Sequence, residues 1–169
     1  MDLHQLYREH YRSLVRFLYR RIGDQARAED LAQEAFVRAI EHQPDKPRPW
    51  LFAVASNLVR DEGRKSSVRR HHLTLIKAEA KSEPAVPGPE VAMERQETVR
   101  QVQTALAELG KRDREALLLW EEGLSYDEIA GILDLSRGSI GTTLSRARSR
   151  LAEAYTRLES KGSDHDVAH

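Results

Sequence analysis

The chain has 169 residues, enough for one ordinary domain or two small ones, and its 27 basic residues balance 27 acidic ones, so net charge indicates no partner. The absence of cysteine excludes disulfides, thiolate zinc sites and cysteine nucleophiles. No apolar run approaches the roughly 20 residues of a membrane span, and the N-terminus lacks the apolar core of a signal peptide, so we expect no membrane insertion and a cytoplasmic location.

Two amphipathic helices are predicted at the N-terminus. Apolar residues recur at spacings of three and four over residues 3–22, which Gly23 follows, and again over residues 25–41. A glycine directly after such a repeat is a common helix stop. The side chains expected to be buried are Leu3, Leu6, His10, Leu14, Phe17 and Leu18 in the first helix, and Ala28, Leu31, Ala35, Phe36, Ala39 and Ile40 in the second.

A third helix is expected to begin near Trp50, after three prolines that favour a stiff, extended connection. One side of this helix is apolar, and the helix runs into a basic stretch over residues 60–72. A short helix over residues 73–80 is the last element expected here. Trp50 itself has two interpretations, an anchor in the core or an exposed aromatic surface.

Residues 81–90 hold three prolines and a glycine with almost no apolar content, which is typical of an extended linker. Beyond them, helices are expected over residues 99–109 and 112–122, each followed by a glycine. The predicted fold class is therefore all-α, with two small helical domains joined by a flexible linker. The expected boundaries are a first domain over residues 1–80, a linker over 81–95, a second domain over 96–160 and a disordered tail over 161–169.

The most informative stretch covers residues 125–151 and is typical of two helices joined by a tight turn. Ser125 and Glu128 form a capping box that starts the first of them, and Ser136 can cap the second. Asp134 falls at the turn, where a left-handed backbone is often needed. The second helix is rich in arginine, as in a helix-turn-helix whose second helix enters the major groove of DNA. An ordinary antiparallel helix pair has the same apolar spacing, and that alternative stays open.

Motifs for catalysis are missing from the sequence. There is no Gly-rich phosphate loop, no His-Glu-x-x-His metal site and no nucleophile beside a base. We therefore expect no catalytic residue, no bound metal and no cofactor. The histidine pairs, His71 with His72 and His165 with His169, are expected to be surface residues.

Four segments together resemble a known family: EDLAQEAFVRA at residues 29–39, PWLFAVASNLVRD at 49–61, LSYDEIA at 124–130 and LSRARSRL at 144–151. In this order and spacing they look like a bacterial sigma factor of the extracytoplasmic-function class, which retains only sigma regions 2 and 4. The resemblance covers nearly the whole chain. It implies a dissociable subunit that gives core RNA polymerase its promoter specificity and is not itself an enzyme.

The resemblance also implies three contact surfaces and a further partner. The second helix would dock on the clamp helices of the largest polymerase subunit, and the second domain would reach the flap. The third helix, with a loop after it at residues 66–70, would recognise and melt minus-ten DNA, and the helix-turn-helix would bind the minus-thirty-five element. An anti-sigma factor is the further partner. The implied residues are Asp30, Gln33, Glu34 and Arg38 for polymerase; Asn57, Arg60, Asp61, Arg64, Lys65, Arg69 and Arg70 for minus-ten DNA; and Arg137, Ser139, Thr142, Thr143, Arg146 and Arg150 for minus-thirty-five DNA.

The chain departs from the family pattern in its helix-turn-helix. Many members carry lysine and arginine at the positions of Gly141 and Thr143, and glycine at that of Asp134. Two alternatives therefore stay open. One is a sigma mimic that titrates an anti-sigma factor without binding DNA, and the other is a stand-alone helix-turn-helix regulator that needs no polymerase.

Overall fold

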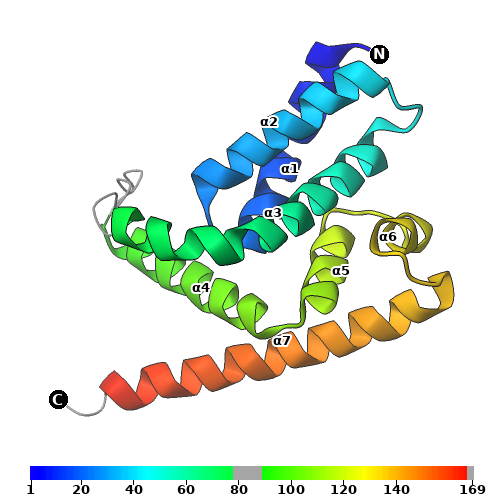
Figure 1. Cartoon of the computed structure of the whole chain (residues 1–169). Coiled ribbons are helices and arrows are strands. Elements are labelled where there is room, and N and C mark those ends of the chain that lie inside the picture. The colour runs from blue at the N-terminus through cyan, green and yellow to red at the C-terminus, as the bar shows by residue number, and fades with distance from the viewer. Residues whose placement is uncertain (78–88, 167–169) are drawn as a thin grey trace.

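The computed structural model describes the backbone of residues 1–77 and 89–166, and the side chains of residues 1–63 and 93–164. All regular structure in these ranges is helical (Figure 1), which confirms the expected all-α fold for the described part of the chain. None of the described helices combines the length and the apolar character needed to cross a membrane. The helices are α1 (Leu3–Ile22), α2 (Gln25–His42), α3 (Pro47–Lys77), α4 (Pro89–Glu108), α5 (Lys111–Glu121), α6 (Tyr126–Leu133) and α7 (Arg137–Asp166).

The ends of α1 and α2 follow from local chemistry. Asp2 caps α1 by accepting hydrogen bonds from two backbone N–H groups, and Gly23 ends it at φ 76°, where its own N–H bonds the carbonyl of Tyr19. Asp24 then accepts a bond from the backbone of Arg27 and starts α2. The first two helices are thus separated by a single tight turn, as the sequence predicts.

Helix α3 is longer than expected at both ends. It begins at Pro47, so two of the prolines expected in an extended connection lie in its first turn. Proline is tolerated there because the first N–H groups of a helix have no partner within it. At the other end the helix continues to Lys77, so residues 66–70, expected to form a loop, and the separate helix expected at residues 73–80 are parts of α3 as far as the backbone is described.

Helices α1, α2 and α3 pack around an aromatic and aliphatic core. Phe17 and Phe52 meet edge to face with ring centroids 5.3 Å apart, a favoured aromatic geometry. Two residues expected in the core are exposed instead, Leu3 by 38% and Ile40 by 46%. They lie in the first turn of α1 and the last turns of α2, where the neighbouring helices do not cover them. Other fully buried side chains of the same core are Leu14, Leu18 and Leu51.

The second domain is built on α7, which packs against α4, α5 and α6 and runs along one side of the molecule (Figure 1). Ser125 and Glu128 make both bonds of the predicted capping box at the start of α6, at 3.2 and 2.9 Å. Asp134 adopts the left-handed conformation expected at the turn, with φ 54°. Two helix ends differ from expectation. Helix α4 already begins at Pro89, within the expected linker, and α7 continues to Asp166, within the expected disordered tail.

The two domains contact each other. Helix α1 packs against α5, and α3 packs against α6. In the described structure, α5 and α6 of the second domain therefore lie against the first domain (Figure 1).

Candidate functional site

Helix α2 presents a polar face made of the four residues expected to bind polymerase. Asp30, Gln33, Glu34 and Arg38 are all exposed, at the spacings of three and four that place side chains on one side of a helix. Glu34 accepts a hydrogen bond from Arg38 at 2.9 Å, and Asp30 lies 3.7 Å from the guanidinium of Arg27. The structure thus brings this set together and leaves it open to a partner.

Apolar side chains that the sequence analysis did not single out for binding border this face. Val37 is 50% exposed, and Ile40 lies one turn further along α2. On α1, the exposed ring of Tyr7 stacks on Tyr11 at 4.4 Å and contacts Phe36 at 5.3 Å. Val37 lies three residues after Glu34 and four after Gln33, so it shares their side of the helix, and this spacing is the signal that could have identified it. A polar face with an apolar border is typical of a protein interface.

The exposed side of α3 carries Asn57, Arg60 and Asp61. Arg60 donates to the side-chain oxygen of Asn57 at 3.3 Å and to the backbone carbonyl of Ile132 in α6 at 3.1 Å. Its guanidinium also lies 3.6 Å from the carboxylate of Glu115, a buried residue of α5. The side chains of the other residues expected at minus-ten DNA lie outside the described residues: Arg64, Lys65, Arg69 and Arg70.

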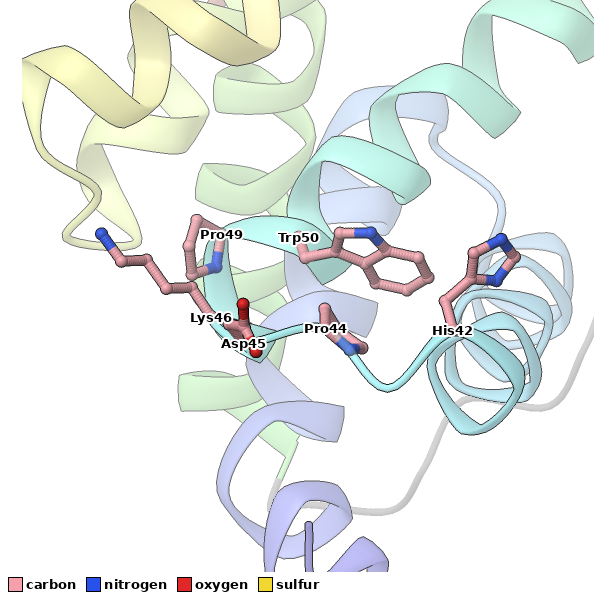
Figure 2. Close-up of a pocket in the computed structure, with 6 residues that line it drawn as sticks. All are labelled: His42, Pro44, Asp45, Lys46, Pro49 and Trp50. Carbon is pink, nitrogen blue, oxygen red and sulfur yellow. The ribbon is translucent and has the colours of Figure 1, made fainter.

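An open hollow of about 590 Å³ lies where α2 ends and α3 begins. Figure 2 shows the indole of Trp50 beside it, with the ring of His42 on one side, Pro49 on the opposite side and Pro44 below the indole. The Trp50 and His42 rings are 5.7 Å apart and tilted by 38°. Trp50 also packs against the core, so it is an anchor that keeps part of its ring at the surface. The amino group of Lys46 lies at the other end of the hollow.

The first turns of α7 present three of the residues expected at minus-thirty-five DNA. Arg137 and Thr142 are exposed, and Ser139 is partly exposed. Arg137 pairs with Asp127 of α6 at 3.0 Å, and Ser139 donates its hydroxyl to the carbonyl of Ser136 at 2.8 Å. Since the N–H groups at a helix N-terminus are unpaired and carry partial positive charge, this end of α7 suits a phosphate.

Thr143 differs from the expectation that it faces the groove. Its side chain is buried, and its hydroxyl donates to the backbone carbonyl of Ser139 at 2.8 Å. A threonine in a helix can satisfy its hydroxyl in this way and then pack like an apolar residue. The side chain therefore belongs to the interior of the second domain.

Arg146 and Arg150 share one buried carboxylate. Asp113 in the first turn of α5 accepts two bonds from Arg146, at 2.7 and 3.1 Å, and one from Arg150 at 3.1 Å. The hydrogen bond from Arg146 holds the pKa of Asp113 below its ordinary value, although burial acts in the opposite direction. Both guanidinium groups remain about half exposed, so the pair leaves one net positive charge on this side of α7.

A metal site is not part of this arrangement: among the residues whose side chains are described, no group of three or more potential ligands could hold an ion. The described side chains of the candidate surfaces make hydrogen bonds, ion pairs, apolar contacts and ring contacts. Those interactions suit the binding of a protein and of nucleic acid.

Comparison with known families finds two matches, one in each half of the chain. Residues 6–69 match the family model for sigma-70 region 2, and residues 99–151 match the model for sigma-70 region 4. The first match covers α1, α2 and the first part of α3, and the second runs from α4 into α7. The predicted pair of region 2-like and region 4-like helical domains is thereby confirmed.

Whole-chain comparisons agree. The chain is 32% identical to RNA polymerase sigma factor YlaC of Bacillus subtilis, over 92% of this chain and 93% of that one. It is 33% identical to the extracytoplasmic-function sigma factor SigM of the same organism, over 93% and 97%. Among solved structures, it is similar to the sigma factor RpoE of Bartonella quintana in complex with the anti-sigma factor NepR, with a TM-score of 0.69, 25% identity and coverage of 92% and 97%. The chain therefore belongs to the extracytoplasmic-function class of sigma-70 factors, non-enzymatic proteins that direct transcription initiation by RNA polymerase through regions 2 and 4.

Proposed function

We propose that the polar face of α2 binds the clamp helices of the largest polymerase subunit. The observation that carries this proposal is the set of four exposed residues, Asp30, Gln33, Glu34 and Arg38, on one side of a helix with an apolar border. Carboxylates and an amide are suited to a basic, hydrogen-bonding helical partner. The second domain would contact the flap.

The minus-ten element is proposed to bind the exposed side of α3 and the hollow beside Trp50. Opening a duplex requires the capture of unstacked bases, and an exposed edge of an indole beside an open hollow supports that role. Asn57 is suited to a base edge, and Arg60 and Lys46 to phosphates. We also assign the basic residues at positions 64, 65, 69 and 70 of the same helix to contacts with the DNA backbone.

The minus-thirty-five element is proposed to bind the start of α7 through Arg137, Ser139 and Thr142. Arg146 and Arg150 would add positive charge near the phosphates while Asp113 holds them. Because buried Thr143 and side-chain-free Gly141 offer no cation, we expect recognition to depend largely on backbone contacts and DNA shape.

An anti-sigma factor is a further proposed partner, and the cytoplasm, where polymerase acts, is the proposed location. The similar RpoE structure, which contains the anti-sigma factor NepR, supports the first point for a chain of this shape. An anti-sigma factor that covered the polar face of α2 would compete directly with polymerase.

The decisive experiment is transcription by core polymerase and this protein from a pool of genomic promoter fragments. Promoter-specific products are expected, and their start sites would give the consensus. A sigma mimic would yield none, and a stand-alone regulator would bind operator DNA tightly without polymerase.

The polymerase surface is tested with the double variant Asp30→Lys/Glu34→Lys. Co-purification with core polymerase should fall about tenfold or more, since two attractive charges become repulsive. The control is Glu9→Lys, a single charge reversal at an exposed position on α1. Equal co-purification of both proteins would rule out this face as the docking surface.

A further inference from the structure

Where the two domains meet, arginines of the first domain are bound to the end of α5. Glu122 lies at this end, and its carboxylate is buried. Arg16 of α1 donates to both oxygens of that carboxylate, at 2.9 and 2.8 Å, while Arg48 of α3 donates to the backbone carbonyl of the same residue. The two-pronged geometry is that of the strong arginine–carboxylate pair. Gly123 follows at φ 81°, which lets the chain turn away and leaves the end of α5 facing α1 and α3.

A second contact joins α3 to the helix-turn-helix. Arg60 donates to the carbonyl of Ile132 near the end of α6, and it lies 3.6 Å from buried Glu115. The phosphate oxygens of a DNA backbone are acceptors that the same guanidinium could bind instead. In the described structure, the second domain therefore binds the guanidinium of Arg60, which the proposed function assigns to DNA binding.

Donors of the second domain also bind acceptors of the first domain. Arg114 of α5 donates to the carbonyl of Arg21, and Gln103 of α4 donates to that of Tyr19, both at the end of α1. Donors of one domain thus bind carbonyl groups at helix ends of the other, where the last carbonyls have no intrahelical partner. The interface is specific because each donor has a defined acceptor.

The same interface carries features that make it easy to open. Three buried polar atoms in it, Arg21 Nε, Arg114 Nε and Glu115 Oε1, have no hydrogen-bond partner within the described part of the chain. Burial also lowers the pKa of Arg21 and of Arg114, as expected for cations that have lost water. The free-energy cost of removing these charges from water offsets much of the stabilisation that the ion pairs contribute. A contact of this kind holds two domains together without fixing them permanently.

We propose that the described structure is a closed state of the sigma factor, in which its second domain masks Arg60 and the Arg16–Glu122 pair acts as the latch. The masking of a DNA-binding group rests on the proposed function, whereas the closed state itself does not. Polymerase and promoter DNA would open the molecule by offering other acceptors to Arg60 and by holding the two domains apart on separate DNA elements.

The latch is tested by energy transfer between dyes on the two domains. The chain has no cysteine, so Gln25→Cys and Ala152→Cys, both at exposed positions, give two specific labelling sites. Arg16→Glu places two negative charges together and should lower the transfer. Arg12→Glu is the matched control: it makes the same charge change one turn away on α1, at an exposed residue without a hydrogen bond or ion pair in the described structure.

Two further measurements keep the closed state testable. Circular dichroism establishes that each variant is folded. Raising the salt concentration should lower the transfer in the unsubstituted protein, because the guanidinium of Arg16 is half exposed and salt screens its attraction to Glu122. Equal transfer in Arg16→Glu and Arg12→Glu would overturn the latch.

Masking is tested with a fluorescent single-stranded DNA of random sequence, because phosphate contacts do not depend on sequence. If only about one molecule in ten is open, breaking the latch should raise the apparent affinity for this DNA about tenfold. The control Arg12→Glu loses the same charge and should show no gain. Lower energy transfer without tighter DNA binding would overturn masking, and neither result depends on promoter-specific transcription, which tests the proposed function separately.

Discussion

Asp113 binds two of the arginines that the sequence analysis assigned to DNA binding. Its buried carboxylate receives three hydrogen bonds from Arg146 and Arg150, which lie 33 and 37 residues away in the sequence. Burial of a carboxylate is unfavourable on its own, and it is tolerated here because the charge is paired. Asp113 therefore fixes the orientation of the arginine side of α7 relative to α5.

Asp113→Asn is expected to destabilise the protein by about 2 kcal/mol at neutral pH, because it weakens charge-assisted bonds at a buried site. The folded pKa of Asp113 is lowered, so its stabilising effect is present above the pKa of the unfolded chain and is lost as pH falls through the folded value. Urea unfolding should therefore show a difference between the two proteins at pH 7 that shrinks below about pH 4.

The control for this prediction is Asp127→Asn. Asp127 also pairs with an arginine, Arg137, but both side chains are 72% exposed, and exposed pairs contribute little. Similar losses for both variants, or a pH-independent loss for Asp113→Asn, would contradict the role given to burial.

Asn57 provides a second prediction for a single residue. Its side chain is exposed on α3, so Asn57→Ala should leave folding and polymerase binding unchanged. The loss of a base contact should slow promoter opening about tenfold. Permanganate reactivity of unpaired thymines measures opening, and co-purification with polymerase measures docking. Equal impairment of the two would place Asn57 in the docking surface instead.

For the end of α1 and for both ends of α6, the local signals in the sequence were sufficient. Gly23 ends α1, Ser125 and Glu128 start α6, and Asp134 takes a positive φ at the turn, all as predicted. These features depend on neighbouring residues alone. The polar face of α2 was also predictable, because the spacing of residues along a single helix is enough to place them on one side of it.

Features that depend on residues far apart in sequence were not predictable in the same way. The shared carboxylate of Asp113 and the Arg16–Glu122 pair join residues 33 to 106 positions apart. Thr143 was taken as polar and exposed because a sequence pattern does not reveal that its hydroxyl is satisfied by its own helix. The hollow beside Trp50 required the turn between α2 and α3 to be known in space.

Within helix α7, a substitution at Gly141 is expected to increase the stability of the protein. A Cβ at this position would lie 3.8 Å from the ring of Tyr126, which is ordinary van der Waals contact. Because glycine in a helix costs about 1 kcal/mol relative to alanine, Gly141→Ala should stabilise the protein by up to that amount in chemical denaturation. Gly123→Ala is the matched control, since φ 81° strains any residue with a Cβ, and it should destabilise. Destabilisation by both would mean that the start of α7 needs glycine for another reason.

At the scale of the whole molecule, the two domains share charges that neither could bury alone. Glu115 and Glu122 belong to the second domain, and Arg60 and Arg16, their cationic partners, belong to the first. Separation of the domains would return both carboxylates to water and free both arginines. The stability of each domain is therefore linked to contact with the other.

This linkage predicts how the whole chain unfolds. At low salt, calorimetry of the unsubstituted protein should give one cooperative transition, because the domains stabilise each other while they are in contact. Arg16→Glu should divide it into two transitions, or broaden it and lower its midpoint, since Glu122 then lies buried beside a like charge. Arg12→Glu should retain the single transition. Two separate transitions in the unsubstituted protein at low salt would show that the contacts between α1 and α5 are too weak to couple the domains, and the closed state would then be a minor one in solution.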